Sequence, residues 1–595
     1  MTETKSMCEA FERTAAAHAG AVALRLPGGA VEITWAEYAD HVRRIAAGLA
    51  TLGVTRGDAV GFMMTNRPEF HLCDTAAMHL GATPFSIYNT SAPGQIAYIL
   101  GNAGNQVAVC EAAFAERLRA AGGDTLQIVC VDGWPEGTIS LGKLVEQGAP
   151  DFDFDAAWQA VGPQDVLTLI YTSGTTGPPK GVEITHAGVL GMLEAMSQVL
   201  PLSPDDRIIS YLPSAHVADR VGSHYQSIIS GLSLTCLADA KQLGAALLDA
   251  RPTLWLAVPR VWEKLKAAIE AAVAREADPQ RQEALRWAID VGVRKVRAEQ
   301  AASRGEGPGP DDELRAEYAR AESAVLPKLR AQLGLDQVNW SVSGAAPIAL
   351  SVLEFFAAVG LLIREVWGMS ELGIATCNPP GRERLGTVGI AMPGYELRLE
   401  PDGELLARGP GVMRGYRHDP EKTAETIDAD GWIHTGDIAT VDADGYYSIV
   451  DRKKELIINS AGKNMSPVNI ESKLKSASPL IGQAVAIGDR RSYNVALVVL
   501  DPDACAAYAA GHDLPSSAAA DLCADPGVRE AVEVAVAEVN SQLSRIEQIK
   551  RFAILPVDWE PGGDELTPTM KLKRKPIAEK YAGVIEGLYA EVGEA

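Results

Sequence analysis

The stretch VLTLIYTSGTTGPPKGV, residues 166–182, indicates how the first half of the chain folds. It opens with an apolar run rich in strand-favouring residues and passes directly into serine, threonine, glycine and proline. A buried strand followed by such a loop places the loop at the strand's carboxyl end, where open α/β sheets bind ligands. The stretch therefore predicts an α/β fold with a ligand-binding loop over residues 172–180.

The loop is not a Walker A phosphate-binding loop. Gly174 and Gly177 are too close together for that motif, and Lys180 is followed by Gly181 where Ser or Thr is required. What remains is a set of hydroxyl groups, backbone N–H groups on glycines and one cation, which suits a mobile polyphosphate. Taken alone, a loop of this composition is more often an ordinary surface turn. The candidate phosphate-binding residues are Thr172, Ser173, Gly174, Thr175, Thr176, Gly177 and Lys180.

On either side of the loop, three segments of the chain show different sequence patterns. Strand-like runs alternate with helical stretches before it, as in AVGFMMT (59–65) and EFHLCDTAAMHLGA (69–82), which predicts parallel sheets covered by helices. Apolar residues at helical spacing predict a helical insertion over about 261–333, with either solvated or membrane-facing outer faces. From about residue 385, short strands and Gly/Asp turns predict antiparallel hairpins. DRKK (451–454) marks the predicted boundary between domains 1–450 and 451–595.

Composition excludes several classes of protein. The chain of 595 residues, 47% hydrophobic and 22% charged, is typical of a folded protein with several cores. Its net charge of −23 argues against nucleic acid as a partner, because phosphates require clustered basic residues. The eight cysteines are scattered without metal-binding spacing, and the longest apolar run, residues 355–363, is too short to span a membrane. The start of the chain lacks the apolar region of a secretory signal, so we expect a cytoplasmic protein.

Four further motifs follow the loop in order: WGMSE (367–371), HTGD (434–437), DRKKELIINSAGKNMSPVNIE (451–471) and LTPTMKLKRK (566–575). Together with the loop, they resemble the signature motifs of the adenylate-forming superfamily over nearly the whole chain. YLPSAHVADR (211–220), VPRVWEKL (258–265) and the helical insertion are similar to the long-chain fatty acyl-CoA synthetases of that superfamily. The residues of WGMSE are similar to those of the same motif in their bubblegum-type branch.

The resemblance implies an architecture and a reaction. The architecture is a large N-terminal domain of parallel sheets with a small β-barrel-like subdomain, followed by a smaller, mobile α+β C-terminal domain. In the reaction, a long-chain fatty carboxylate attacks Mg²⁺-bound ATP to give acyl-AMP and pyrophosphate, and CoA then displaces AMP. Acyl transfer to a carrier protein, a luciferase-like monooxygenase and a noncatalytic sensor are the alternatives.

The resemblance also implies which residues bind the nucleotide. It makes Asp437 the acceptor of both ribose hydroxyls, assisted by Arg452, and Trp367 the neighbour of the adenine. Taken without the resemblance, Asp437 suits an Asx turn and Trp367 a core position. The other nucleotide-binding candidates are Gly344, Ala345 and Ala346 of SGAAPI (343–348) and Gly368, Met369 and Ser370 of WGMSE.

Three residues are the catalytic candidates by resemblance: Glu371 as the magnesium ligand, His216 as a gate between the nucleotide and acyl sites, and Lys571. Their alternatives are a helix-start carboxylate, a core histidine and a solvated basic run. A carboxylate that approaches the α-phosphate meets a repulsion of about 4 kcal/mol at a separation near 4 Å, which an ammonium would offset. Lys573 remains a second candidate, because Met570 stands where many relatives have glycine.

The remaining expectations concern the second step and the cellular location. By resemblance, Lys454 is the hinge about which the C-terminal domain turns, and Gly462 and Lys463 bind CoA. The expected cofactor is Mg²⁺, and the expected substrates are ATP, CoA and a long-chain fatty acid. A weak peripheral contact with the inner face of the membrane is left open.

Overall fold

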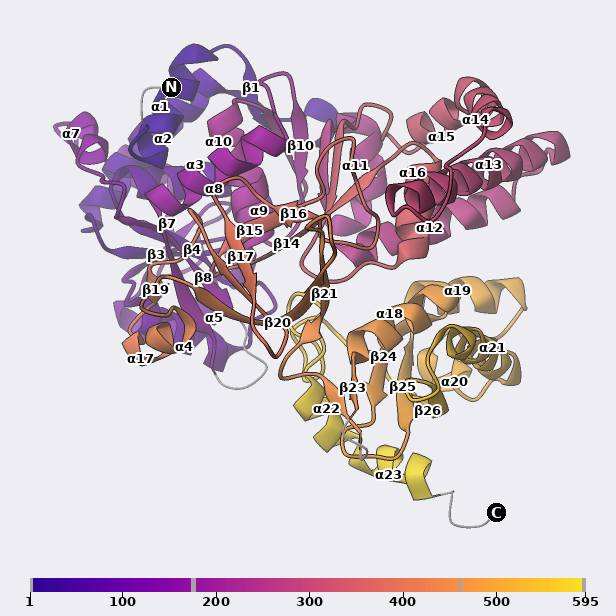
Figure 1. Ribbon diagram of the computed structural model, residues 1–595. Coiled ribbons are helices and arrows are strands. Elements are labelled where there is room, and N and C mark those ends of the chain that lie inside the picture. Colours follow the sequence, from indigo (N-terminus) through magenta and orange to yellow (C-terminus); the bar gives the residue numbers. More distant parts are fainter. Residues whose placement is uncertain (1–3, 173–177, 460–462, 591–595) are drawn as a thin grey trace.

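The computed structural model describes residues 4–172, 178–459 and 463–590 of the chain. The loop candidates Ser173, Gly174, Thr175, Thr176 and Gly177 lie outside the described residues, as does the CoA-binding candidate Gly462. Figure 1 shows a large N-terminal domain, a group of helices at one end of it, and a smaller C-terminal domain drawn in orange to yellow. The α/β fold class predicted from the sequence is confirmed.

The largest sheet contains the strand that ends in the predicted ligand loop. This strand, β8 (Val166–Thr172), pairs antiparallel with β9 (Lys180–Thr185), and Thr172 lies opposite Lys180. The two residues therefore mark the two ends of the loop at one edge of the sheet. The strand order is β19-β9-β8-β4-β3-β5-β6-β7, parallel from β8 to β7. The other strands are β3 (Ala59–Met63), β4 (Thr83–Ser86), β5 (Val107–Cys110), β6 (Gln127–Cys130), β7 (Ile139–Ser140) and β19 (Gly415–Tyr416).

A five-stranded sheet of order β12-β13-β14-β15-β16 brings two of the sequence motifs together. Its first three strands are parallel, and Ser343 lies opposite both Ala257 and Glu365, so SGAAPI and WGMSE leave the sheet at the same edge. A smaller, four-stranded sheet has the order β10-β11-β1-β2. The strands are β12 (Leu254–Ala257), β13 (Trp340–Ser343), β14 (Ile363–Met369), β15 (Gly373–Cys377), β16 (Ile390–Ala391), β1 (Val22–Arg25), β2 (Glu32–Thr34), β10 (Arg207–Ser210) and β11 (Ser233–Cys236).

Helices cover these sheets, as the alternating sequence pattern predicts. The segment after β3 forms α3 (Pro68–His79), which is buried along its whole length. By contrast α2 (Trp35–Thr51) is amphipathic and begins with a capping box between Thr34 and Glu37. The other helices here are α1 (Met7–Ala17), α4 (Pro93–Ala103), α5 (Ala112–Gly122), α6 (Leu141–Glu146), α7 (Phe154–Gln159), α8 (His186–Val199), α9 (Val217–Asp219), α10 (Gln226–Ser230) and α11 (Leu243–Ala250).

The predicted helical insertion forms the group of helices at the upper right of Figure 1. Its helices are α12 (Pro259–Ala274), α13 (Pro279–Ser303), α14 (Asp312–Ala324) and α15 (Leu326–Gln332), and α16 (Leu350–Ala358) packs against α13. Trp262, Ile269 and Val273 are buried in one core cluster with Phe356, so the apolar face of α12 points into the protein. No helix in the described parts of the chain combines the length and the apolar character needed to cross a membrane.

The β-rich segment forms an antiparallel sheet of order β17-β18-β20-β21, as predicted. Its strands are β17 (Glu396–Leu399), β18 (Glu404–Arg408), β20 (Ile433–Val441) and β21 (Tyr447–Arg452), with α17 (Pro420–Thr426) between them. The register places Asp437 opposite Arg452, so two nucleotide-binding candidates from separate motifs are cross-strand neighbours.

The C-terminal domain is built around a three-stranded sheet, β24-β25-β26, with an antiparallel and a parallel pair. All seven residues of the central strand β25 are buried, which explains its continuous apolar sequence NVALVVL. The strands are β22 (Ile457–Ile458), β23 (Asn464–Met465), β24 (Ile481–Ile487), β25 (Asn494–Leu500) and β26 (Ile549–Ile554). The helices are α18 (Pro467–Ala477), α19 (Pro502–Gly511), α20 (Ala519–Leu522), α21 (Pro526–Gln542), α22 (Arg574–Lys580) and α23 (Ala582–Ala590).

Candidate active site

Lys180, Tyr416 and Glu371 form a connected group beside the loop. The Lys180 ammonium lies 5.0 Å from the centroid of the Tyr416 ring, and the Tyr416 hydroxyl donates a 2.8 Å hydrogen bond to Oε1 of Glu371. Tyr416 is held there because β19 pairs with β9, which places it opposite Val182. Burial, and then the neighbouring Lys422, lower the pKa of Lys180, whereas Glu371 acts in the opposite direction. A cation and a carboxylate therefore lie on the two sides of one tyrosine.

Glu371 is a buried carboxylate in the turn between β14 and β15, and the alternative of a helix-start residue is wrong. The N–H of Met413 donates to its backbone carbonyl at 2.8 Å, which fixes the turn. A carboxylate has about four acceptor positions, so the bond from Tyr416 leaves room for a further ligand. No group of three or more His, Cys, Asp or Glu side chains in the described ranges is arranged to hold a metal ion. A single carboxylate fits Mg²⁺ all the same, because this ion commonly takes one or two carboxylates together with substrate phosphates.

Asp437 is held by two partners from different motifs. Arg452 Nε lies 2.7 Å from its Oδ1, and Nε1 of Trp367 donates to its Oδ2 at 2.8 Å. Burial raises the pKa of Asp437, while Arg452 and the Trp367 hydrogen bond act in the opposite direction. Because both oxygens are engaged by these side chains, Asp437 is not an Asx-turn residue. Trp367 is only 7% exposed, so it is a core residue that also orients the carboxylate.

Lys571 is carried on a tight turn of the C-terminal domain. Leu566 and Leu572 form an isolated antiparallel bridge, and the Lys571 N–H donates to the Thr567 hydroxyl at 3.0 Å. Between them Met570 has a φ of 65°, the left-handed region that favours glycine. This conformation is one that glycine adopts without strain, which agrees with the glycine that the resemblance implies at position 570.

The charges of the nucleotide-binding candidates act on the pKa of Lys571. The surrounding protein lowers the pKa of Lys571 most, Arg452 lowers it further, and Asp437 and Glu371 raise it. The residue as a whole is exposed, so the burial that lowers the pKa acts at the ammonium end of the side chain. Lys571 also lowers the pKa of His216, so these residues form one electrostatic group.

Lys573, the second candidate, has its ammonium engaged elsewhere. Nζ of Lys573 donates a 2.7 Å hydrogen bond to the carbonyl of Gly563, and its N–H donates to the carbonyl of Glu565 at 2.8 Å. These contacts hold Lys573 within the C-terminal domain. The geometry therefore favours Lys571 as the lysine that faces the site.

His216 caps a short helix at the edge of the same site. Its Nδ1 accepts the N–H of Ala218 at 3.1 Å, so the neutral ring carries its proton on Nε2. Burial first, and Lys571 second, lower the pKa of His216 to about 4, which keeps the ring neutral near pH 7. The next turn is anchored by Asp219, whose Oδ1 accepts the Ser210 hydroxyl at 3.0 Å.

The small-residue candidates line the ends of strands in the same sheet. Ala345 has a φ of 70° in the turn that follows β13, and Ala345 and Ala346 are exposed there. A Cβ at Gly344 would lie 2.9 Å from Cγ2 of Val366, and one at Gly368 would lie 2.0 Å from the carbonyl oxygen of Gly373. Glycine is required at 368 for this close approach of two backbones. Met369 ends β14, and Ser370 begins the turn that carries Glu371.

Among the described contacts, neither the hinge candidate Lys454 nor the CoA candidate Lys463 bonds to a member of the group described above. Lys454 is exposed two residues after the end of β21, and Lys463 is exposed with its N–H bonded to Oδ1 of Asn459 at 2.9 Å. Lys454 influences the site only electrostatically, because it lowers the pKa of Lys180. Sequence reasoning missed Tyr416, since only the pairing of β19 with β9 brings the RGY segment to Glu371.

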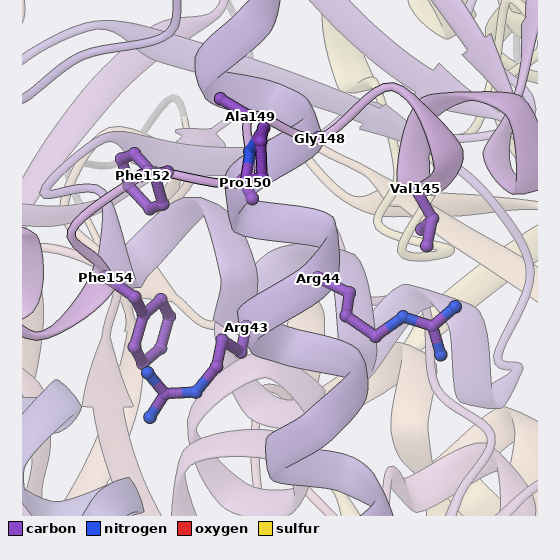
Figure 2. A pocket seen from close by; sticks show the side chains of 9 residues that line it. Arg43, Arg44, Val145, Gly148, Ala149, Pro150, Phe152 and Phe154 are labelled. Carbon is purple, nitrogen blue, oxygen red and sulfur yellow. The ribbon is translucent and has the colours of Figure 1, made fainter.

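Two hollows of the N-terminal domain contain none of the predicted site residues. One of about 260 Å³ is shown in Figure 2, where Arg43 reaches towards the Phe154 ring and Arg44 points the other way from the same helix. The Arg43 guanidinium lies 4.3 Å from that ring's centroid. The second, of about 680 Å³, shares Arg44 and Val145 with the first and is mostly apolar. Neither hollow is part of the site around Glu371 and Lys571.

Comparison with known proteins places the chain in a family. The family model described as AMP-binding enzyme matches residues 11–417, and the model of the AMP-binding enzyme C-terminal domain matches residues 454–593. Solved structures with the same fold include the anthranilate CoA ligase AuaEII, with a TM-score of 0.73, 21% identity and coverage of 98% of this chain and 99% of that one. The adenylation domain of a carboxylate reductase from Mycobacterium chelonae gives a TM-score of 0.77 at 21% identity, over 98% of this chain and 91% of that one.

Three relatives are similar in sequence over most of the chain. The fadD11 protein of Mycobacterium tuberculosis, whose name assigns it provisionally to the fatty-acid–CoA ligases, is 54% identical over 76% of this chain and 79% of its own length. The long-chain-fatty-acid–CoA ligase FadD15 of Mycobacterium bovis is 35% identical over 94% of this chain and 92% of its own. The long-chain-fatty-acid–CoA ligase ACSBG2 of Gallus gallus is 30% identical over 99% of this chain and 81% of its own. These matches confirm the resemblance drawn from the motifs, and the chain belongs to the AMP-binding enzyme family.

Proposed function

We propose that the protein is a long-chain fatty acyl-CoA ligase that forms AMP. In the first half-reaction, an oxygen of the fatty carboxylate attacks the α-phosphorus of ATP, and the bond to pyrophosphate breaks. In the second, the CoA thiol loses its proton, its sulfur attacks the acyl carbon, and AMP leaves with both electrons of the broken bond. The names of the relatives that match nearly the whole chain support this reaction and this substrate class.

The nucleotide is proposed to lie across the group that Lys180, Glu371 and Asp437 form. Asp437 would accept the ribose hydroxyls, because Trp367 and Arg452 hold its carboxylate in one orientation. The loop 172–180 and Lys180 would bind the phosphates, and SGAAPI and WGMSE would lie against the adenine. Mg²⁺ would be held by Glu371 and the phosphates and would supply charge neutralisation.

One feature carries the proposal: Lys571 lies on a turn of the C-terminal domain, and the charges of Arg452, Asp437 and Glu371 in the nucleotide group shift its pKa. The carboxylate and the phosphate are both anions, and their repulsion is about 4 kcal/mol at close approach. An ammonium between them would offset that repulsion, which corresponds to roughly three decades in rate.

For the second half-reaction, we propose that the C-terminal domain turns about Lys454. This movement would withdraw Lys571 and bring the segment 460–467, with Gly462 and Lys463, to the acyl-AMP. Lys463 is exposed and its side chain is on the surface, which is compatible with contact to the anionic CoA. Acyl transfer to a carrier protein is the alternative, but the relatives are named as CoA ligases.

The two half-reactions measured separately test the proposal. Lys571→Ala should lower pyrophosphate–ATP exchange by roughly three decades and spare thioester formation from preformed acyl-AMP. Lys573→Ala is the matched control, because it removes only the bond to Gly563 and should cost far less. Equal losses in both half-reactions of the Lys571 variant would contradict the proposed role.

A substrate panel tests the reaction class. Wild-type protein with acids from C8 to C24, ATP and CoA should release AMP and acyl-CoA, identified by mass spectrometry. Product formed only with an added carrier protein would favour the alternative acceptor. We place the enzyme in the cytoplasm, and cosedimentation with anionic lipid vesicles would reveal peripheral contact with the inner face of the membrane.

A further inference from the structure

Two ion pairs join the helical insertion to the C-terminal domain. Arg260 Nη2 binds Oδ2 of Asp501, and Nζ of Lys264 binds Oδ2 of Asp503 at 2.6 Å. Both cations are on the first turns of α12, and both carboxylates are at the start of α19. We call this pair of contacts the latch.

The two sides of the latch are held firmly in their own domains. Pro259 begins α12 directly after β12, and Glu263 binds Nη1 of Arg260 at 3.3 Å. On the other side, Oδ1 of Asp501 caps α19 by accepting the N–H groups of Asp503 and Ala504, each at 3.1 Å. Only Oδ2 of Asp501 is therefore directed at Arg260. The Arg260 and Asp501 side chains are 25% and 10% exposed, so the contact is partly shielded from water.

The latch lies at the edge of the sheet that carries the nucleotide motifs. Ala257, the last residue of β12, is in register with Ser343, the first residue of SGAAPI, and Ser343 is in register with Glu365, which precedes WGMSE. Arg260 is the second residue of α12, the helix that follows β12. A contact at this edge therefore holds the C-terminal domain, which carries Lys571, against the sheet whose strand β14 leads into the turn with Glu371.

We infer that Arg260 and Lys264 are positioning residues for the adenylation half-reaction. Through Asp501 and Asp503, they hold the C-terminal domain in the orientation that presents Lys571 to the nucleotide, and the ion pairs must part before the domain turns. This inference rests on the proposed two-step function. It assigns the residues no contact with substrate: their effect is to shift the equilibrium between the two domain orientations.

The strength of the latch fits a contact that opens in every turnover. The Lys264–Asp503 pair is largely exposed and contributes little to the free energy that holds the domains together. The Arg260–Asp501 pair is partly buried, and its hydrogen bond is stronger because both partners are charged. A contact of this size changes the population of the closed orientation severalfold without locking it. Stronger binding would slow the second half-reaction, because the domain would have to break it.

Neutral variants that keep the local folds test the inference. Asp501→Asn retains an amide oxygen to cap α19 and loses only the charge that Arg260 binds. Arg260→Gln removes the same pair from the other side. Each should lower pyrophosphate–ATP exchange by about three- to tenfold, and leave thioester formation from preformed acyl-AMP unchanged or faster. The double variant should be no slower than either single one, because one interaction has been removed twice.

Two controls separate the latch from general effects of charge. Arg297→Gln breaks a pair with Glu354, 2.8 Å long, that lies entirely within the insertion and its neighbour α16, and it should leave both half-reactions unchanged. Lys264→Asp replaces a weak attraction by repulsion from Asp503 and should slow pyrophosphate–ATP exchange, and adding Asp503→Lys should restore it. Equal losses in both half-reactions, multiplicative losses in the double variant, or no loss at all would each overturn the inference.

A measurement without substrate keeps the test independent of the proposed reaction. The domains also approach at Thr90 and Gly562, where a Cβ on the glycine would lie 2.8 Å from Oγ1 of Thr90. Amide hydrogen exchange of residues 88–92 and 560–571 should be faster in the Arg260→Gln, Asp501→Asn double variant than in wild type. Amide hydrogen exchange that is unchanged in both segments would overturn the inference about the latch. Wild-type protein that exchanges no pyrophosphate with any acid would instead refute the proposed function and leave this measurement valid.

Discussion

At the scale of the residue, Tyr416 gives the site much of its geometry. Its ring faces the Lys180 ammonium and its hydroxyl binds Glu371, so one side chain orients both the proposed phosphate ligand and the proposed metal ligand. A hydrogen bond to a charged group contributes about 1.5–3 kcal/mol, more than a bond between neutral groups. Tyr416 therefore fixes Glu371 without occupying all of its acceptor positions.

We predict that Tyr416→Phe raises the KM for Mg²⁺-ATP by at least about tenfold, because Glu371 loses its only side-chain donor among the described contacts. Steady-state kinetics with varied Mg²⁺-ATP measures this. Tyr395→Phe is the matched control: its hydroxyl donates to the carbonyl of Leu372, the neighbour of Glu371, at 3.1 Å. That variant should lose about 1 kcal/mol of stability and keep its KM. Equal KM values in the two variants would contradict the assigned role.

Lys571 gives a second prediction at this scale. Burial by the surrounding protein and the charge of Arg452 lower the pKa of Lys571 from its usual value of 10.5. The ammonium is the form that offsets repulsion between the anions, so adenylation should fall with rising pH before 10.5 is reached. The profile of kcat/KM for pyrophosphate exchange reports this group in the free enzyme. Lys571→Arg should abolish the alkaline fall, since arginine does not titrate in this range; an unchanged fall would assign it to another group, such as Lys180.

At the scale of the element, the turn before Lys571 is under strain that a substitution can change. Met570 has a φ of 65°, a region in which side chains cost about 1–2 kcal/mol and branched ones cost most. We predict that Met570→Gly keeps adenylation at the wild-type rate, whereas Met570→Val slows it severalfold and lowers the thermal midpoint. Exchange assays and thermal unfolding measure the two effects. A valine variant as active as the glycine variant would show that the turn does not determine the placement of Lys571.

Much of the element order follows from the sequence, because the signals are local. The strand before the loop, the helices of the insertion and the hairpins after residue 385 all depend on periodicity or turn residues within one segment. The structure confirms each of them. Glu371 as a helix-start carboxylate and Asp437 as an Asx residue were the alternatives suggested by local patterns alone, and both are wrong.

What could not be predicted depends on pairing between distant segments. Trp367 meets Asp437 and Tyr416 meets Glu371 because of strand register and sheet order, which no short window of sequence specifies. The preference for Lys571 over Lys573 is of the same kind, since it rests on the bond from Lys573 to Gly563. The latch likewise joins residues 241 positions apart in the chain.

At the scale of the whole molecule, the first helix is joined to the core by a titratable contact. The N–H of Met7, which begins α1, donates to Nδ1 of His186 at 3.0 Å, and His186 begins α8. Burial lowers the pKa of His186 to about 3, with Asp165 acting in the opposite direction and His79 in the same one. Protonation of Nδ1 would remove the acceptor for Met7, so the folded protein requires the neutral ring.

This contact predicts how stability responds to acid. The folded pKa of His186 lies below its unfolded value, so the unfolded chain binds more protons below pH 6.5, and stability is lost as the pH falls from there towards 3. For a shift from 6.5 to about 3, the loss between pH 7 and pH 5 is about 2 kcal/mol. His216, whose pKa is lowered to about 4, adds a loss of similar size and the same sign.

His186→Asn retains an acceptor for Met7 and does not titrate. Between pH 7 and pH 5, this variant should therefore lose about half of the stability that wild type loses through the two histidines. Urea midpoints at pH 7 and pH 5, followed by tryptophan fluorescence, measure both proteins. Parallel falls in the two midpoints would mean that His186 is already free to protonate in the folded protein, and that α1 is held by its apolar contacts alone.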